Sequence, residues 1–196
     1  FDLLSTTFYY TFFGTIGSIV FGILTAQLVN QKFFGRTFMR SVLLFPYVGP
    51  VVALAYTWEL LLDPYSGTLN NLLMNFQVIQ EPLNLLGQKY LTINFFGFDL
   101  KLRLALTTVI IFEIWRYFPL AFLFILARLQ AVPKELYEAA EVDGAGPLQK
   151  FISITLPQIT AVISILFMIR FIWNFNKFED IFLLTGGASG TRTLPI

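Results

Sequence analysis

The sequence predicts an all-α membrane protein, a polytopic bundle of helices, and three observations lead to this. Hydrophobic residues make up 56% of the 196 positions and charged residues only 13%, roughly half the share of a soluble protein. The mean hydropathy is +0.70. Four stretches reach the ~20 apolar residues that a spanning helix needs, at residues 8–29, 41–62, 104–127 and 155–174.

The composition excludes several kinds of chemistry. The chain contains no cysteine and no histidine, which excludes disulfides, thiol nucleophiles, histidine acid–base catalysis and the usual zinc sites. The net charge is +1, so there is no basic field of the kind that binds nucleic acid. We expect no metal and no cofactor.

The first span contains Gly14, Gly17 and Gly22. Small side chains let membrane helices approach closely, although glycine is also simply common in membrane helices, and both interpretations stay open. The next segment, residues 30–40, contains three basic residues and no acid, which is typical of a cytoplasmic loop. We therefore place this segment inside the cell and the start of the chain outside.

The second span contains Pro46, Gly49 and Pro50. A proline inside a helix frees a carbonyl and kinks the chain. In membranes such breaks survive where neighbouring groups or water satisfy the backbone, often along a transport pathway. We therefore expect an interrupted helix here.

The long segment 63–103 is placed outside by the alternation of the spans. Glycines and prolines punctuate it, as is typical of loops. Residues 69–76 predict a short interfacial helix. Residues 91–100 are apolar, rich in β-forming residues and interrupted by Gly97, which predicts either a small hairpin or a loop on the surface.

The third span contains Glu113 and Arg116, one helical turn apart, so the two side chains can pair on one face. Ionisable groups inside a membrane are costly unless they are paired or hydrated, and they therefore indicate a functional face. The alternative is that both lie near the outer boundary and extend to water. Pro119 predicts a kink in this span.

The segment 135–157 is polar, charged and helix-forming at once. Residues 133–142 begin with proline and are rich in Glu, Ala and Leu, which predicts a short helix. Leu136, Ala139 and Ala140 lie three and four residues apart and form one small apolar face. Such an element is too polar to span a membrane and is suited to docking.

Asp143 and Gly144 end this helix, because glycine accepts the positive φ of a turn. A second short helix is expected after the turn. Phe151, Ile154 and Leu156 then return the chain to apolar surroundings, and Pro157 stands at the start of the next span.

The spacing of these residues resembles the EAA loop of ABC-importer permeases, most closely that of the carbohydrate-importer permeases of the MalF type. The matching positions are Glu138, Ala139, Ala140, Asp143, Gly144, Ala145, Phe151, Ile154, Leu156 and Pro157. In that family the loop is the cytoplasmic element that the ATPase subunit grips. The resemblance implies that residues 130–157 couple this chain to an ATPase.

The resemblance also implies the type I ABC importer transmembrane-domain (MetI-like) fold, in a multi-pass protein of the cytoplasmic membrane. The implied partners are ATP-binding-cassette ATPase subunits, a second permease subunit in a heterodimer, an external solute-binding protein and membrane lipid. The chain has no GxxxxGK[ST] sequence that would bind ATP, so we expect no enzymatic activity in it. The family's first and last helices are not found, so we expect residues 1–196 to be incomplete at both ends.

Trp173 to Asn176 alternate aromatic rings with amides. Flat rings stack on the C–H faces of sugars, and amides hydrogen-bond to hydroxyls without a charge. The spacing places Arg170, Trp173 and Asn174 on one side of a helix and Phe175 on another. The alternative is an aromatic belt at the membrane interface.

The run from Trp173 onward resembles the family pattern F-N-x-F-D-x-x-x-L-T-x-G-G-P, which includes sugar-contacting positions. Carried over, these fall on Trp173, Asn174 and Lys177. This sequence departs from the pattern at Glu179-Asp180 and at Gly187-Ala188-Ser189. The candidate residues of the substrate pathway are Glu113, Arg116, Tyr117, Arg170, Trp173, Asn174 and Lys177.

The function implied by the resemblance is that of a permease subunit in an ATP-driven, binding-protein-dependent importer for a sugar or oligosaccharide. The same architecture importing a polyol or a glycerol phosphodiester is an alternative. An ion-coupled transporter would require a carboxylate at the membrane centre, for which Glu113 is the candidate. A membrane enzyme is disfavoured, because clustered catalytic groups are missing from the sequence.

Overall fold

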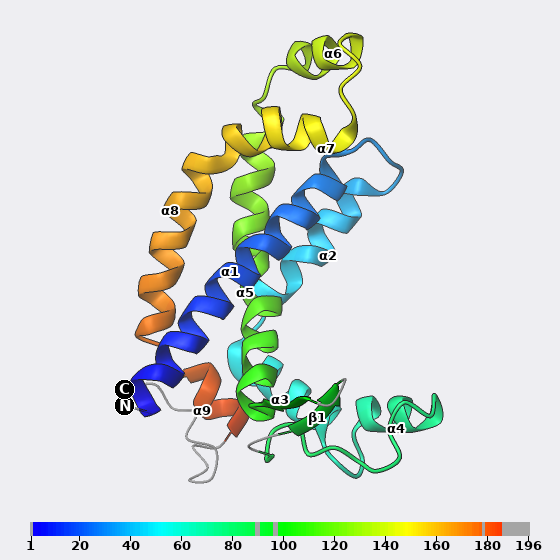
Figure 1. The fold of residues 1–196 in the computed structure, drawn as a ribbon, viewed down its shortest axis with the longest axis vertical. Helices are drawn as coiled ribbons and strands as arrows, with labels where there is room; N and C mark the ends of the chain where they lie inside the picture. Colours follow the sequence, from blue (N-terminus) through cyan, green and yellow to red (C-terminus); the bar gives the residue numbers. More distant parts are fainter. Residues whose placement is uncertain (1, 89–90, 96–97, 178, 186–196) are drawn as a thin grey trace. The chain divides into compact units, whose positions relative to one another are not determined.

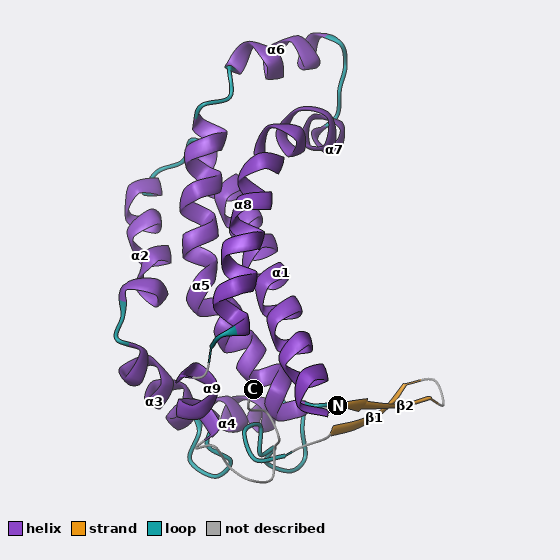
Figure 2. Cartoon of the chain, turned by 90° about the vertical axis from the view of Figure 1, so that its left-hand side faces the viewer, coloured by secondary structure: helices purple, strands orange, loops and turns teal. Residues whose placement is uncertain are grey.

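The computed structural model describes residues 2–88, 91–95, 98–177 and 179–185. The described part is helical apart from one two-stranded hairpin (Figure 1, Figure 2). The elements are α1 (Asp2–Asn30), α2 (Arg36–Val48), α3 (Val51–Leu62), α4 (Thr68–Asn75), β1 (Leu91–Phe95), β2 (Phe98–Leu102), α5 (Leu104–Gln130), α6 (Lys134–Val142), α7 (Pro147–Lys150), a π-helical turn η1 (Phe151–Thr155), α8 (Leu156–Phe175) and α9 (Glu179–Thr185).

Among the described residues, three helical stretches are long and apolar enough to cross a membrane: Leu4–Asn30, Leu104–Gln130 and Pro147–Phe175. Helices α2 and α3 pass the same test together, which makes up to four spans if the pair counts as one. The predicted helical membrane fold is confirmed.

The predicted interruption of the second span is also confirmed. Helix α2 ends at Val48, and Pro50 is the N-cap of α3 with an extended backbone, at φ −59° and ψ 128°. Pro46 has a different role from the one expected, because it lies buried inside α2 rather than at the break. Pro46 cannot donate a hydrogen bond to the carbonyl of Val42, and its ring crowds that carbonyl, which suits a position two residues before α2 ends.

Two predicted boundaries are corrected. The second span was expected to begin at residue 41, but α2 begins at Arg36, because basic side chains near a helix end can extend to water while their backbone stays helical. The second short helix and the fourth span were expected to be separate. They form one continuous helical stretch, Pro147–Phe175, joined by the π turn.

The chain divides into two compact units, each described separately below. Unit 1 comprises the described residues within 1–14, 48–113 and 173–196. Unit 2 comprises residues 15–47 and 114–172.

The core of unit 2 is apolar and close-packed. Phe122, Ile125 and Ile159 are fully buried within it. Gly22 lies so close to α5 that a Cβ atom there would stand 2.6 Å from the Cβ of Ala121. A larger residue would force the helices apart, so of the two interpretations left open for the glycines of α1, close approach holds at Gly22.

The part of unit 1 between α3 and α5 contains the elements predicted there. Helix α4 matches the expected helix at 69–76 within one residue. The hairpin alternative for residues 91–100 is confirmed, since β1 and β2 pair antiparallel from Leu91 opposite Leu102 to Phe95 opposite Phe98. The turn at Gly97 lies outside the described residues.

A buried asparagine organises the segment around α4. Asn70 is 1% exposed, and its amide donates to the carbonyl oxygens of Leu83 at 2.9 Å and of Pro64 at 3.3 Å. Its own side-chain oxygen accepts from the Leu83 amide at 3.2 Å. The side chain of Asp63 accepts hydrogen bonds from Ser66, which lower its pKa below the usual value. The segment is therefore held by specific hydrogen bonds rather than by apolar packing alone.

Candidate functional site

The most distinctive surface element is α6 with the turn and helix that follow it, all in unit 2. Figure 1 shows α6 lying beyond the ends of the long helices of its unit. Gly144 has φ +77°, as expected from the sequence. Its amide donates to the Glu141 carbonyl at 3.0 Å, and the Ala145 amide donates to the Ala140 carbonyl at 2.8 Å. These two bonds satisfy carbonyls that the end of the helix would otherwise leave unpaired.

Helix α6 buries none of its residues against this chain. Leu136, which belongs to the predicted apolar face, is 43% exposed. Glu138 and Ala139 are exposed as well, and Ala140 is half-buried. An isolated nine-residue helix is unstable in water without an apolar partner, so this face is available for one.

Two polar contacts join α6 to the helical stretch behind it. The hydroxyls of Tyr137 and Thr155 are 3.0 Å apart, which links α6 to the π turn. The Lys150 ammonium donates to a Glu141 carboxylate oxygen at 2.7 Å, which links α6 to α7. Both contacts lie partly at the surface, so they guide the position of α6 more than they stabilise it.

The end of α5 is joined to the start of α8 by one arginine. Arg128 donates from Nε to the Gln158 carbonyl at 2.9 Å and from Nη2 to the Gln158 side chain at 2.6 Å. The fork geometry of the guanidinium makes this a directional contact. The two helices that flank the α6 element therefore meet where the element begins and ends.

The π turn stands immediately before Leu156 and Pro157. Because Pro157 has no amide hydrogen, a carbonyl in the preceding turn lacks its α-helical partner, and π turns are one way in which helices accommodate such a loss. Phe151 is half-buried, whereas Leu156 is 36% exposed and Pro157 is exposed.

Unit 1 contains a buried cluster of charged side chains. Lys177 lies 3.2 Å from a carboxylate oxygen of Glu113 and 2.9 Å from one of Asp180. Both acids are fully buried, and the lysine is 15% exposed. A buried carboxylate is costly unless it is paired, and Lys177 contacts both acids, with one positive charge against two carboxyl groups.

The predicted candidates Glu113 and Asn174 lie together at this cluster. A Cβ atom on Gly14 would stand 3.2 Å from Cγ of Glu113 and 3.3 Å from Nδ2 of Asn174. The absence of a side chain at Gly14 therefore lets α1 approach both residues. The alternative that Glu113 extends to water is excluded by its complete burial.

Unit 2 contains a second polar cluster around the ring of Tyr117. The guanidinium carbon of Arg170 lies 4.2 Å from the ring centroid and that of Arg116 lies 5.0 Å from it. The ring of Tyr47 packs edge-on at 6.0 Å. Arginine stacks favourably on aromatic faces, so the tyrosine holds both cations in fixed positions.

The predicted ligand residues differ strongly in exposure. Arg170 and Asn174 are buried, at 1% and 0%, whereas Trp173 is 50% exposed. Phe175 is 42% exposed. The departure at Gly187-Ala188-Ser189 lies outside the described residues.

Several residues of these clusters were not predicted from the sequence. Asp180 was noted only as a departure from a pattern, although its spacing of three from Lys177 is a pairing signal. Tyr137, Gln158 and Asn70 gave no signal, because their partners lie on other elements.

A model of the family described as "Binding-protein-dependent transport system inner membrane component" matches residues 18–195. The inner membrane ABC transporter permease protein YcjO of Escherichia coli (strain K12) is 37% identical over 179 residues, covering 91% of this chain and 57% of that protein. The trehalose/maltose transport system permease protein MalF of Thermococcus litoralis is 32% identical over 202 residues, covering 99% and 63%.

The sn-glycerol-3-phosphate transport system permease protein UgpA of Escherichia coli O6:K15:H31 is 30% identical over 197 residues, covering 100% of this chain and 61% of that protein. The chain thus spans less than two thirds of the length of these relatives. A solved bacterial alginate ABC transporter, in complex with alginate pentasaccharide-bound periplasmic protein, matches with a TM-score of 0.79 at 22% identity, over 98% of this chain and 62% of that one. At this identity the likeness concerns the fold alone.

Proposed function

The chain belongs to the family of binding-protein-dependent transport system inner membrane components, and we propose that it forms part of a permease subunit in an ATP-driven importer. The subunit would contribute half of the pathway through the cytoplasmic membrane and pair with a second, different permease subunit. ATP hydrolysis belongs to separate ATPase subunits, and an external binding protein delivers the solute.

The observation that carries this proposal is the exposed face of α6. The helix buries nothing within the chain, it carries Glu138 and Ala139 on its surface, and Gly144 turns the chain back into a span. A short helix with an apolar face and acidic neighbours suits a cleft on a partner protein. We assign that cleft to the ATPase, with Glu138 facing a basic surface.

Closure of the ATPase would move α6, and the contacts of unit 2 would pass that movement to the spans. The Tyr137–Thr155 and Glu141–Lys150 contacts connect α6 with the stretch that continues into α8. Arg128 connects the same region with α5. Rigid elements joined in this way move as bodies, which is how ATP binding would switch the access of the pathway.

We propose a sugar or oligosaccharide as the solute. The half-exposed Trp173 offers a ring for stacking, and Asn174 and Lys177 lie close to it in sequence. The relative that carries trehalose/maltose in its name supports a carbohydrate.

A glycerol phosphodiester is a second candidate solute. The two guanidinium groups at Tyr117 favour it, because arginine is well suited to bind phosphate. The relative named for sn-glycerol-3-phosphate transport carries a glycerol phosphomonoester in its name, which shares the glycerol phosphate group with such a solute.

Single cysteines in this cysteine-free region test the arrangement. Val142 on α6 and Tyr65 before α4 are almost equally exposed, at 89% and 87%. A membrane-impermeant thiol reagent should label Tyr65→Cys in intact cells but Val142→Cys only after the membrane is opened. Adding the ATPase subunit should slow the labelling of Val142→Cys at least fivefold and leave Tyr65→Cys unchanged.

Labelling of Val142→Cys in intact cells would contradict the proposed orientation. Equal labelling rates with and without the ATPase would contradict the role of α6. Adding Glu138→Lys should restore fast labelling of Val142→Cys, whereas Glu135→Lys, on the same helix, serves as a charge-matched control.

A further inference from the structure

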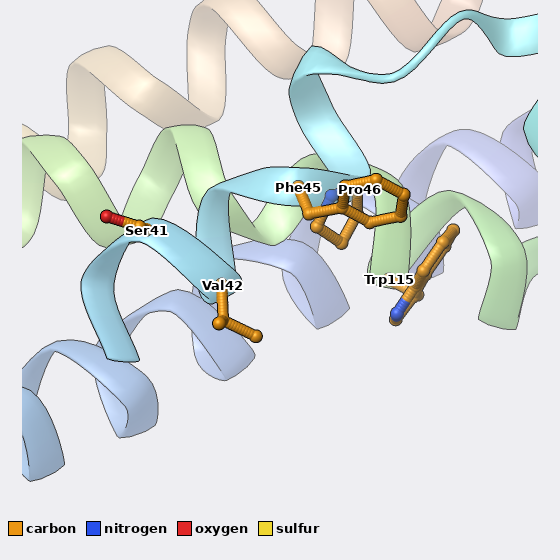
Figure 3. A pocket seen from close by; sticks show the side chains of 5 residues that line it. All are labelled: Ser41, Val42, Phe45, Pro46 and Trp115. Atoms are coloured by element: carbon orange, nitrogen blue, oxygen red, sulfur yellow. The ribbon is translucent and has the colours of Figure 1, made fainter. Parts of the chain in front are cut away.

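An apolar groove lies between α2 and α5 in unit 2. Figure 3 shows Ser41, Val42, Phe45 and Pro46 of α2 and Trp115 of α5 around it. Its volume is about 480 Å³. Val42 and Phe45 are 48% and 63% exposed, so the groove is open to the surroundings of the chain.

The lining of this groove does not suit a sugar. Ser41 carries its one side-chain hydroxyl, and that hydroxyl already donates to the Thr37 carbonyl at 3.3 Å. A sugar requires several well-placed hydrogen-bonding groups, whereas a hydrocarbon chain requires none. The groove therefore fits an acyl chain.

The chain becomes strongly basic at the end of α2 next to the groove. Lys32, Arg36 and Arg40 lie within eleven residues, 30–40, that contain no acid. Arg40 directly precedes the groove residue Ser41. Its Nε atom is buried and has no hydrogen-bond partner among the described residues. A buried guanidinium nitrogen without a partner indicates an acceptor that is not part of this chain.

The distance between these features matches a lipid. Helical residues rise ~1.5 Å each, so Arg40 and Phe45 are about 7–8 Å apart along α2. A phosphate at Arg40 would thus place the upper part of its acyl chain beside Phe45 and Trp115. Basic clusters at the end of a spanning helix attract anionic lipid headgroups.

We propose that this groove binds an anionic phospholipid, with one acyl chain against Val42, Phe45 and Trp115 and the phosphate at Arg40. Arg36 and Lys32 supply further positive charge. The inference requires that the chain lies in a membrane, but it depends neither on the transported solute nor on the ATPase.

Quenching of Trp115 by brominated lipids tests the proposal, since bromine quenches a tryptophan only on close approach. The full chain would carry Phe in place of every other tryptophan, Trp58 and Trp173 included. It would be placed in vesicles of brominated phosphatidylglycerol or brominated phosphatidylcholine diluted with the unbrominated neutral lipid. We expect half-maximal quenching at a mole fraction of the anionic lipid at least fivefold lower than that of the neutral one.

Substitutions distinguish the contribution of the lipid headgroup from that of its acyl chain. Arg40→Gln should reduce the fivefold preference to about onefold, and Arg40→Lys should keep most of it. Lys134→Gln, which removes a basic residue on α6, should leave it unchanged. Val42→Trp, measured through the loss of bound lipid in native mass spectrometry, should weaken both lipids alike by filling the groove.

Three outcomes would overturn the proposal. Equal quenching by both lipids would make the groove an ordinary lipid-facing surface. A preference for the anionic lipid that survives Arg40→Gln would mean that the phosphate binds elsewhere. Absence of quenching by either lipid would mean that another protein surface covers the groove.

Discussion

Helices α4 and α6 end in the same way but with different residues. In both, the first residue past the C-cap has a positive φ, 56° at Gln77 and 77° at Gly144. In both, two backbone hydrogen bonds close the turn. The bonds at α4 run from Gln77 to Met74 and from Val78 to Leu73, at 3.0 and 2.9 Å, in the same pattern as at Gly144.

The surroundings of the two turns explain why one has glycine and the other does not. Helix α6 buries no residue, and nothing lies within 4 Å of the position that a Cβ of Gly144 would occupy. That turn must therefore be favoured by its own residue. Helix α4 is held by Asn70, whose hydrogen bonds offset the ~1–2 kcal/mol that a residue with a Cβ loses at positive φ. The chemistry of the residue itself specifies the turn at Gly144, whereas tertiary contacts impose the turn at Gln77.

Of three substitutions at or near these two turns, Asn70→Ala should have the largest effect on stability, and it should destabilise the segment around α4. The change removes the hydrogen bonds to Leu83 and Pro64 and leaves a partly buried amide without its acceptor, at a cost of about 3 kcal/mol. Hydrogen exchange at the Leu83 amide should accelerate ~100-fold. Asn71→Ala, at the exposed neighbouring position, should change it by less than ~3-fold. Equal effects of the two changes would mean that Asn70 does not hold the segment.

Gly144→Val should have the next largest effect on stability, and it should destabilise the turn after α6. A β-branched residue resists positive φ, so the turn should lose about 2 kcal/mol and the Ala145 amide should exchange ~30-fold faster. Transport should be uncoupled from ATP hydrolysis while the protein stays in the membrane. Gly146→Val is the control, because Gly146 is extended at φ −72° and ψ 167° and also faces open space. Normal coupled transport by Gly144→Val would show that the turn has no mechanical role in coupling transport to ATP hydrolysis.

Gln77→Gly should have the smallest effect on the stability of its turn, and it should stabilise the turn rather than destabilise it. Relief of the positive φ should exceed the entropy that glycine loses on folding, giving about 0.5 kcal/mol of stabilisation. Gln80→Gly, at a nearby exposed position without positive φ, should destabilise by a similar amount. Slower exchange of the Val78 amide would support the first expectation, whereas faster exchange would show that the glutamine is not strained.

The same distinction explains how much of the fold could be predicted from the sequence. The spans, α4, the hairpin and the turn at Gly144 follow from local hydropathy, propensity and turn chemistry, and each was predicted close to its place. The bounds of α2 were less well predicted, because the basic residues at its start were assigned to a loop. The burial of Asn70 was not predicted, since nothing in the local sequence distinguishes a buried amide of a short helix from an exposed one.

The candidate site was predicted less completely than the fold. The spacing of three between Glu113 and Arg116 suggested a pair within one helix, which stays a prediction. The contact of Glu113 with Lys177, 64 positions further along the chain, was not predicted. Such a contact depends on how helices pack, which no short spacing encodes. Trp173 and Asn174 were expected to share a face, yet one is half-exposed and the other is buried. Their contact with a solute stays a prediction.

The π turn at Phe151–Thr155 has a consequence for the register of the faces on either side of it. A π turn closes its hydrogen bonds one residue later than an α turn, so it holds one residue in excess. Each helical residue turns the chain by about 100°. Because the residues of the π turn are spread more widely, its five residues cover about the same angle as four α-helical residues, and deleting Ser153 would let the α-helix run through with the faces on either side unrotated. Leu148 and Lys150 would keep their directions relative to α8, whereas deleting a residue inside α8 would rotate them by about 100°. The excess residue is thus absorbed inside the turn, and the direction in which the coupling element is presented does not depend on it.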